Sequence, residues 1–285
     1  MGFYMMKKVL SVFCLLSVLP ASAPAAAEQL PLWELAFGAG VLTAPHYRGS
    51  DESSTYPHPF VFPVYRGKRV KSDESGIRGI LLAGEKARLI FSIDGGLPVR
   101  DDDSAREGMP KLGAVGQIGP MLRIKLWERP QNHQTLILDL PVRAAFAVNS
   151  GIEHIGYTAF PKIVYRRRFE LFDSKWKMGL TAGLLWADEE YHDYYYQVDP
   201  QYATPARPAY DASAGFNGSR LISTFYHRDE KKFLSFYALY DNVSGAAFED
   251  SPLVTASDGL TAGFVVSWFL AKSRQRVEVD DWEWK

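Results

Sequence analysis

The chain has 285 residues, of which 47% are hydrophobic and 14% aromatic, and its 32 basic and 33 acidic side chains give a formal net charge of −1. The chain therefore lacks the overall excess of basic residues that is typical of nucleic-acid-binding proteins, and the single cysteine excludes a disulfide framework. The mean hydropathy of −0.16, together with the lack of a long apolar stretch beyond the N-terminus, excludes a helical membrane protein.

The N-terminal segment has the pattern of a secretory signal. Two lysines precede the apolar run 9–19, which is shorter than the roughly 20 residues that a membrane-spanning helix needs. Small residues follow this run up to Ala27. We therefore expect residues 1–27 to be a cleaved signal peptide, and we expect export of a mature chain that contains no cysteine.

Further along the chain, apolar and polar residues alternate with the period of a β-strand. The alternation appears first in residues 87–93 and is clearest in 136–146, where Asp139 and Arg143 lie on the polar face. Residues 176–186 form an apolar row with a tryptophan at each end, which is typical of the aromatic girdles of transmembrane barrels. The recurrence of this pattern predicts an all-β fold.

We predict a single antiparallel transmembrane β-barrel of about twelve strands over residues 28–270, with short periplasmic turns and longer outer loops. If residues 68–98 form one long bent strand instead, the predicted count is ten. The twelve predicted strands are 32–43, 56–66, 68–73, 76–83, 86–98, 111–127, 133–147, 155–170, 174–190, 211–228, 231–243 and 258–270.

The last predicted strand distinguishes a membrane barrel from a soluble one, because barrels of the outer membrane end in a strand that the barrel insertion machinery reads. Such a strand combines a polar residue, a glycine and two hydrophobic or aromatic positions. Here these candidate positions are Thr261, Gly263, Val266 and Trp268. We therefore expect the chain to lie in the outer membrane, with membrane lipid and the insertion machinery as partners.

Several segments resemble the MipA/OmpV family, the family of the MltA-interacting protein. They are WELAFGAGVLTAPHYRGSD (residues 33–51), YPHPFVFPVYRG (56–67), the aromatic run 194–196, interpreted as the end of a strand, and FEDSPLV (248–254). The resemblance covers most of the mature chain. It implies an outer-membrane scaffold that links a murein lytic transglycosylase to a penicillin-binding murein synthase.

The chain departs from this family by continuing beyond its last predicted strand, where relatives usually stop at a terminal aromatic residue. We expect residues 271–285 to form a C-terminal periplasmic tail. One interpretation is a frayed polar segment. The other is a partner-binding segment anchored by Trp282 and Trp284, because tryptophan is enriched at interface hot spots.

Basic side chains gather on the inward faces near the expected periplasmic ends of the strands. They are Arg88, Arg123, Lys125, Arg166, Arg168, Lys175 and Lys177. They either form ion pairs with Asp94, Asp139 and Glu170 in an interior filled by side chains, or form a collar that binds or filters anions or an acidic partner. The second interpretation implies an alternative function, a narrow outer-membrane channel for small solutes.

The predicted outer loops are acidic at 101–103, 188–193 and 249–250. Carboxylates there either hold divalent cations as hard oxygen ligands or form an ordinary solvated surface. This leaves a calcium or magnesium site as an open alternative.

Components of a His–Asp catalytic site are present in these loops, but nothing in their spacing requires one. The candidates are His46, Asp51, His192 and Asp193, with Ser50 or Ser251 as nucleophile. GxSxG and HExxH motifs are missing from the sequence, and the GSD and DSPL elements are typical of turns. We therefore expect a non-enzymatic protein with no catalytic residues, cofactor or metal.

Overall fold

The chain closes into an antiparallel β-barrel in the computed structural model, which describes residues 28–73, 76–96 and 103–279. The predicted signal peptide, residues 1–27, lies outside the described residues. So do Trp282 and Trp284 of the predicted tail.

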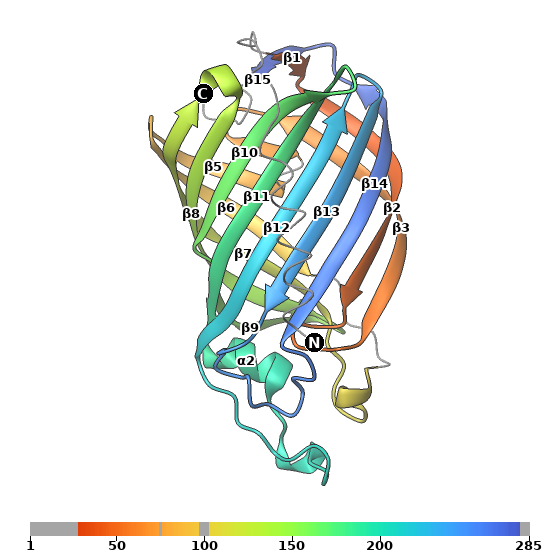
Figure 1. Ribbon diagram of the computed structural model, residues 1–285, viewed down its shortest axis with the longest axis vertical. Coiled ribbons are helices and arrows are strands. Elements are labelled where there is room, and N and C mark those ends of the chain that lie inside the picture. Colours follow the sequence, from red (N-terminus) through yellow and green to blue (C-terminus); the bar gives the residue numbers. More distant parts are fainter. Residues whose placement is uncertain (1–27, 74–75, 97–102, 280–285) are drawn as a thin grey trace.

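The barrel wall consists of twelve strands, which confirms the predicted fold class and strand count. Neighbours in the chain pair from β2 to β9 and from β10 to β14, and β14 pairs with β2 to close the ring (Figure 1). β9 and β10 both pair with β8 and β11, so they are two halves of one wall strand. β4 and β5 pair antiparallel with each other, so the ten-strand alternative is wrong.

The strands of the wall have the following bounds: β2 (Trp33–Pro45), β3 (Ser53–Arg66), β4 (Val70–Asp73), β5 (Gly76–Ala83), β6 (Ala87–Gly96), β7 (Ala114–Arg129), β8 (Gln134–Val148), β9 (Ile152–Ala159), β10 (Lys162–Leu171), β11 (Ser174–Ala187), β12 (Gly215–Arg228), β13 (Lys232–Asn242) and β14 (Asp258–Lys272).

The two faces of the wall follow the alternation of the sequence, most regularly in β8. Its odd-numbered residues from Thr135 to Ala147 are buried, whereas Val142 on the opposite face is 53% exposed. Successive side chains of a strand point to opposite faces of the sheet. The apolar row of β8 is therefore the outer surface of the barrel, and Asp139 and Arg143 point to its interior.

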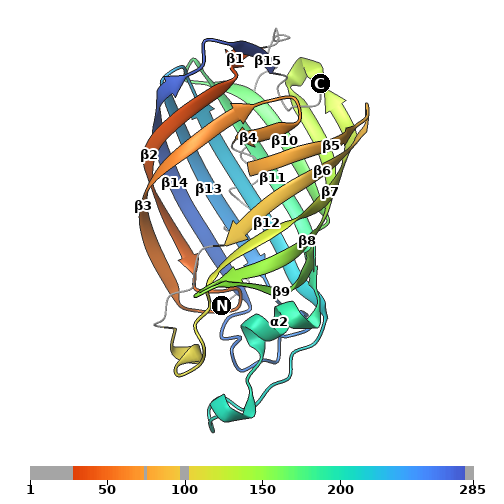
Figure 2. The ribbon, with the colours of Figure 1, turned by 180° about the vertical axis from the view of Figure 1, so that it is seen from behind.

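The two ends of the barrel differ, and both views show the difference (Figures 1 and 2). At the end that we call the turn end, the connections are short, and β1 (Glu28–Pro31) pairs with β15 (Arg276–Val279) in a separate two-stranded sheet. This end also carries η2 (Pro130–Asn132). The opposite loop end carries the long connections, with η1 (Ser104–Arg106), α2 (Glu189–Tyr196) and η3 (Pro200–Tyr202).

Two local predictions were wrong. The aromatic run Tyr194–Tyr196 belongs to helix α2 and does not end a strand, because β11 stops at Ala187 and Asp188 caps the helix by accepting a hydrogen bond from the Tyr191 N–H at 3.1 Å. An acceptor at this position is typical of a helix start. In the tail, residues 276–279 are not frayed, because they pair with β1 along their whole length.

Candidate functional site

The predicted basic collar lies in the wall toward the turn end, and its best-defined member is Arg123. The Arg123 guanidinium donates two hydrogen bonds to the Asp139 carboxylate, at 2.7 and 2.8 Å, and both side chains are buried. Arg88 lies opposite Arg123 in the pairing of β6 with β7. A bidentate pair of this kind fixes both side chains in position. For Arg123, the contacts are those of an interior ion pair.

The other predicted collar residues lie on β7, β10 and β11. The Lys125 ammonium forms a 2.6 Å ion pair with Glu128, and Lys177 lies 5.9 Å from the centre of the Tyr226 ring. Arg166 and Arg168 are buried on β10. Lys175 lies opposite Glu170 in the pairing of β11 with β10. The structure thus places all seven basic residues in one half of the barrel, and their use as an anion filter stays a prediction.

The predicted insertion signal lies in β14, the strand that closes the barrel against β2. Trp268 is 45% exposed and faces outward, as a residue of a lipid-facing girdle does. A side chain added at Gly263 would meet the Val41 carbonyl oxygen at 2.5 Å, so glycine permits the close approach of β14 to β2. Val266 pairs with Ala39 across the same seam, and Thr261 pairs with Leu239 of β13. Gly263, Val266 and Trp268 are therefore part of the seam that closes the barrel, whereas Thr261 pairs on the β13 side of the same strand.

At the loop end, aromatic side chains from distant segments form a buried cluster, here called the aromatic cap. Tyr194 and Tyr195 pack both against Val115, Ala145 and Ala147 on the inner wall of β7 and β8 and against the cluster around Val243 after β13. These parts of the ring are separated by several strands on either side. α2 therefore reaches from one wall of the barrel to another. The aromatic cap consists of Tyr47, Tyr191, Tyr194, Tyr195, Tyr196 and Phe248.

Hydrogen bonds of buried hydroxyl groups tie this cap to the loops. The Tyr196 hydroxyl donates to the Arg48 carbonyl at 2.9 Å, and the Ser251 hydroxyl donates to the Tyr196 carbonyl at 2.7 Å. Burial raises the pKa of Tyr196 above its usual range, so the phenol stays neutral and acts as a donor. Phe248 is fully buried and stacks on Tyr196 at 3.6 Å between ring centres. The FEDSPLV segment is thus part of the cap, and Ser251 has the structural role expected of a turn residue.

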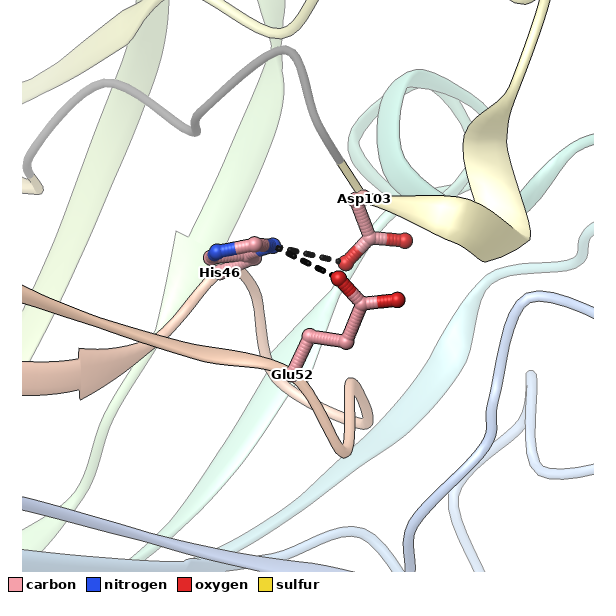
Figure 3. A group of neighbouring side chains, drawn as sticks. All are labelled: His46, Glu52 and Asp103. Atoms are coloured by element: carbon pink, nitrogen blue, oxygen red, sulfur yellow. Dashed lines mark hydrogen bonds and ion pairs between the residues drawn. The ribbon is translucent and has the colours of Figure 1, made fainter.

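Besides the aromatic cap, the loop end carries a polar cluster that is centred on His46, which directly follows β2. His46 Nδ1 lies 3.0 Å from Asp103 Oδ2 and 4.0 Å from Glu52 Oε2 (Figure 3). The other ring nitrogen, Nε2, lies 2.8 Å from the Ser54 hydroxyl. His46 and Asp103 are buried, whereas Glu52 is about one-third exposed with a side-chain exposure of 35%. Two carboxylates and one imidazole therefore meet where the β2–β3 loop approaches the β6–β7 loop.

The catalytic candidates of the sequence are only partly brought together. His46 meets Asp103, not Asp51, whose carboxylate accepts a hydrogen bond from Thr255 at 2.7 Å. His192 lies elsewhere in the loop end, against the Phe248 ring and 2.6 Å from the Ser213 carbonyl oxygen. The His–Asp grouping that the sequence offered but did not require, with His46 and His192 together, is therefore not assembled.

Sequence reasoning missed the contribution of Glu52 and Ser54 to the His46 cluster. Both lie within eight residues of His46, as HxxxxxExS, which was the available signal. Asp103 belongs to the acidic loop that was a candidate for cation binding, but the chain separation of 57 residues hid its contact with His46.

Within the described residues, no helix has the length and apolar character needed to cross a membrane. The sheet, closed and apolar on its outer face, defines a β-barrel of the outer-membrane class. A sequence model of the family described as MltA-interacting protein MipA matches residues 37–270, and the chain belongs to this family.

Two solved structures match the chain at low similarity. A bacterial polysaccharide outer membrane secretin is 7% identical with a TM-score of 0.40, and the match covers 85% of this chain and 99% of that one. The CymD monoaromatic hydrocarbon channel is 11% identical with a TM-score of 0.31, covering 88% and 95% of the two chains. None of the curated proteins compared with the chain matches it.

Proposed function

We propose that this outer-membrane barrel is a non-enzymatic scaffold that binds a murein lytic transglycosylase and a penicillin-binding murein synthase. The observation that carries the proposal is membership of a family described by its interaction with MltA. The aromatic cap agrees with it, because α2 packs against two separate parts of the wall and so lies across the loop end. A scaffold needs an accessible docking surface and no open path through the barrel.

The turn end offers such a surface. In the predicted orientation it faces the periplasm, where murein enzymes work. Within the described part of the chain, β1 and β15 pair only with each other. The outer edge of β1 is occupied, because the Gln29 and Pro31 carbonyls accept hydrogen bonds from arginine side chains at 2.9 and 2.8 Å. β15 keeps one edge of backbone N–H and C=O groups. An extended segment of a partner can add a strand to an edge of this kind. We therefore place the docking surface on the β1–β15 sheet and the tail that continues from it.

Co-purification tests this proposal with the refolded mature chain, residues 28–285, and with purified transglycosylase and synthase. We expect both enzymes to bind, and we expect deletion of residues 273–285 to weaken transglycosylase binding by about tenfold or more, because it removes β15 and unpairs β1. A Lys111→Glu substitution at the loop end is the control and should bind as the unchanged chain does. Failure of both enzymes to bind the full mature chain would overturn the scaffold proposal.

The second candidate function is a narrow channel for small solutes, which the inward-facing charges of the wall favour. Channel activity requires the aromatic cap to move, because α2 lies across the loop end. If ions pass, reversing the charge with Lys175→Glu and Lys177→Glu should shift selectivity from anions toward cations. Single-channel recording of refolded protein in planar bilayers measures this shift. A complete lack of conductance in the unchanged protein would exclude the channel.

A further inference from the structure

The His46 cluster has the geometry of a metal site. His46, Glu52 and Asp103 each offer one ligand atom, a ring nitrogen or a carboxylate oxygen, and these three atoms all lie within 4.8 Å of one another. In a tetrahedral zinc site with bonds of about 2.1 Å, two ligand atoms are roughly 3.4 Å apart. The distances of 3.0 and 4.0 Å from Nδ1 to the two carboxylates bracket this spacing (Figure 3). Small side-chain movements would therefore bring all three atoms onto one cation.

Each of the three side chains has a hydrogen-bond partner from a serine, which for Glu52 and His46 lies on the atom that does not face the cluster and for Asp103 lies on the ligand oxygen Oδ2 itself. The Ser50 hydroxyl donates to Asp103 Oδ2 at 2.8 Å, and the Ser104 N–H donates to Glu52 Oε1 at 3.0 Å. His46 Nε2 is 2.8 Å from the Ser54 hydroxyl, which can accept the proton of this nitrogen. That tautomer leaves the lone pair of Nδ1 directed at the two carboxylates. Support of this kind, which fixes the tautomer and orientation of ligands, is a regular feature of metal sites.

The charges in the cluster call for a cation. Two carboxylates meet one imidazole, and the Asp103 side chain is only 3% exposed. Within the described residues, its second oxygen, Oδ1, is buried without a hydrogen-bond partner. The Arg106 guanidinium adds a positive charge that acts on Asp103, while the two carboxylates still converge on a single imidazole. A divalent ion neutralises both carboxylates, and buried charges are usually paired or bound to metal.

We propose that His46, Glu52 and Asp103 bind a divalent transition-metal cation, specifically zinc. Imidazole and carboxylate ligands suit Zn²⁺, with a fourth position open to water. The histidine disfavours calcium and magnesium, which prefer oxygen ligands. The order Asp103–His46–Ser54 also matches an acid–base–hydroxyl relay. In such a relay, however, Nδ1 serves a single carboxylate, whereas here Glu52 approaches the same nitrogen.

The metal would join two loops that the sequence separates. His46 and Glu52 flank the first loop between β2 and β3, and Asp103 directly precedes η1 in the second. A bound ion would hold the second loop against the mouth of the barrel. This inference concerns the loop end and does not depend on the scaffold function proposed for the turn end.

Calorimetry of the refolded mature chain, freed of metal with a chelator and titrated with zinc chloride, tests the proposal. We expect one Zn²⁺ per chain, and we expect His46→Ala to weaken binding at least 30-fold and Glu52→Gln about tenfold. Ser54→Ala should weaken it about tenfold through the lost support of His46. The absorption spectrum of the Co²⁺-loaded protein should show tetrahedral coordination that disappears in His46→Ala.

His154→Ala is the matched control. His154 Nδ1 pairs with Glu190 Oε2 at 3.2 Å at the same end of the barrel, and this residue is not part of the three-ligand group. The variant should bind Zn²⁺ as the unchanged chain does. The proposal is overturned if the unchanged chain takes up no Zn²⁺, if it binds Ca²⁺ or Mg²⁺ equally well, or if His46→Ala and Glu52→Gln, both verified as folded, keep the original affinity.

Discussion

The wall of the barrel and the aromatic cap bury polar groups by different means. In the wall, charged side chains on neighbouring strands pair with each other, as Arg123 does with Asp139 toward the turn end and Arg220 does with Asp241 toward the loop end. In the cap, neutral tyrosines donate to backbone carbonyls of distant loops, as Tyr196 does to Arg48 across 148 residues. The wall therefore depends on local pairing that repeats along each strand. The cap depends on a few contacts between segments far apart in the chain.

Removing the buried Asp139 carboxylate from the wall should lower the stability of the barrel more than any other change considered below. Asp139→Asn removes the negative charge that pairs with the buried Arg123 guanidinium, which is left close to Lys162 and Arg166. Breaking a buried pair from one side costs about 3–5 kcal/mol, because the remaining charge stays uncompensated. Urea unfolding of the refolded barrel, followed by its mobility on a gel, measures this loss of stability.

Two further variants sharpen this test of the wall. Replacing both partners, Arg123→Met with Asp139→Leu, should restore most of the lost stability, because an apolar pair of similar volume is often neutral. Glu128→Gln breaks the exposed pair with Lys125 and should cost less than about 1 kcal/mol. If Asp139→Asn costs no more than Glu128→Gln, the wall does not rely on its buried pairs.

The corresponding change in the cap is Phe248→Ala. The ring is fully buried and stacked on Tyr196, so its removal should destabilise the cap by about 3 kcal/mol. The effect should be local, raising amide hydrogen exchange in α2 without changing the exchange of β8. Phe172→Ala is the control, because this phenylalanine is 90% exposed at the turn end. Unchanged exchange in α2 would show that Phe248 does not hold the helix in place.

The same contrast explains which parts of the fold were predictable from the sequence. The alternation of residues 136–146 predicted the two faces of β8, because the period of two is a direct consequence of strand geometry. The parity of the strands was compatible with the division of 68–83 into β4 and β5 but also with the ten-strand alternative, and the pairing of β4 with β5 decides between them. Predictions of this kind depend on neighbours in the sequence or on closure of the ring.

The cap and the His46 cluster were not predictable in the same way. Three consecutive tyrosines favour a strand by intrinsic preference, and the signal for α2 was the less conspicuous Asp188 followed by two glutamates, an acidic helix start. The His46–Asp103 contact joins two loops whose approach is set by the curvature of the whole barrel. Nothing in the sequence near either residue identifies the other.

A smaller effect tests the electrostatics of the cap. Burial, followed by the negative charges of Glu189, Asp211, Asp199 and Glu190, raises the pKa of Asp193 to about 6. The unfolded value is lower, so ionisation of Asp193 opposes folding: the cost is absent below about pH 4, grows up to about pH 6 and is complete above it. Because the side chain is partly solvated, we expect this cost to be only about 1 kcal/mol.

Asp193→Asn should therefore stabilise α2 at pH 7.5 and leave it unchanged at pH 4. The expected gain corresponds to about fivefold slower amide exchange in α2 than in the unchanged chain at pH 7.5. Comparing the two proteins at one pH cancels the intrinsic pH dependence of exchange. Glu107→Gln, which removes an exposed carboxylate beside η1, serves as the control. It should leave amide exchange in α2 unchanged at both pH values. An equal stabilisation at both pH values would mean that the amide itself packs better, and that repulsion among the carboxylates of the cap does not limit its stability.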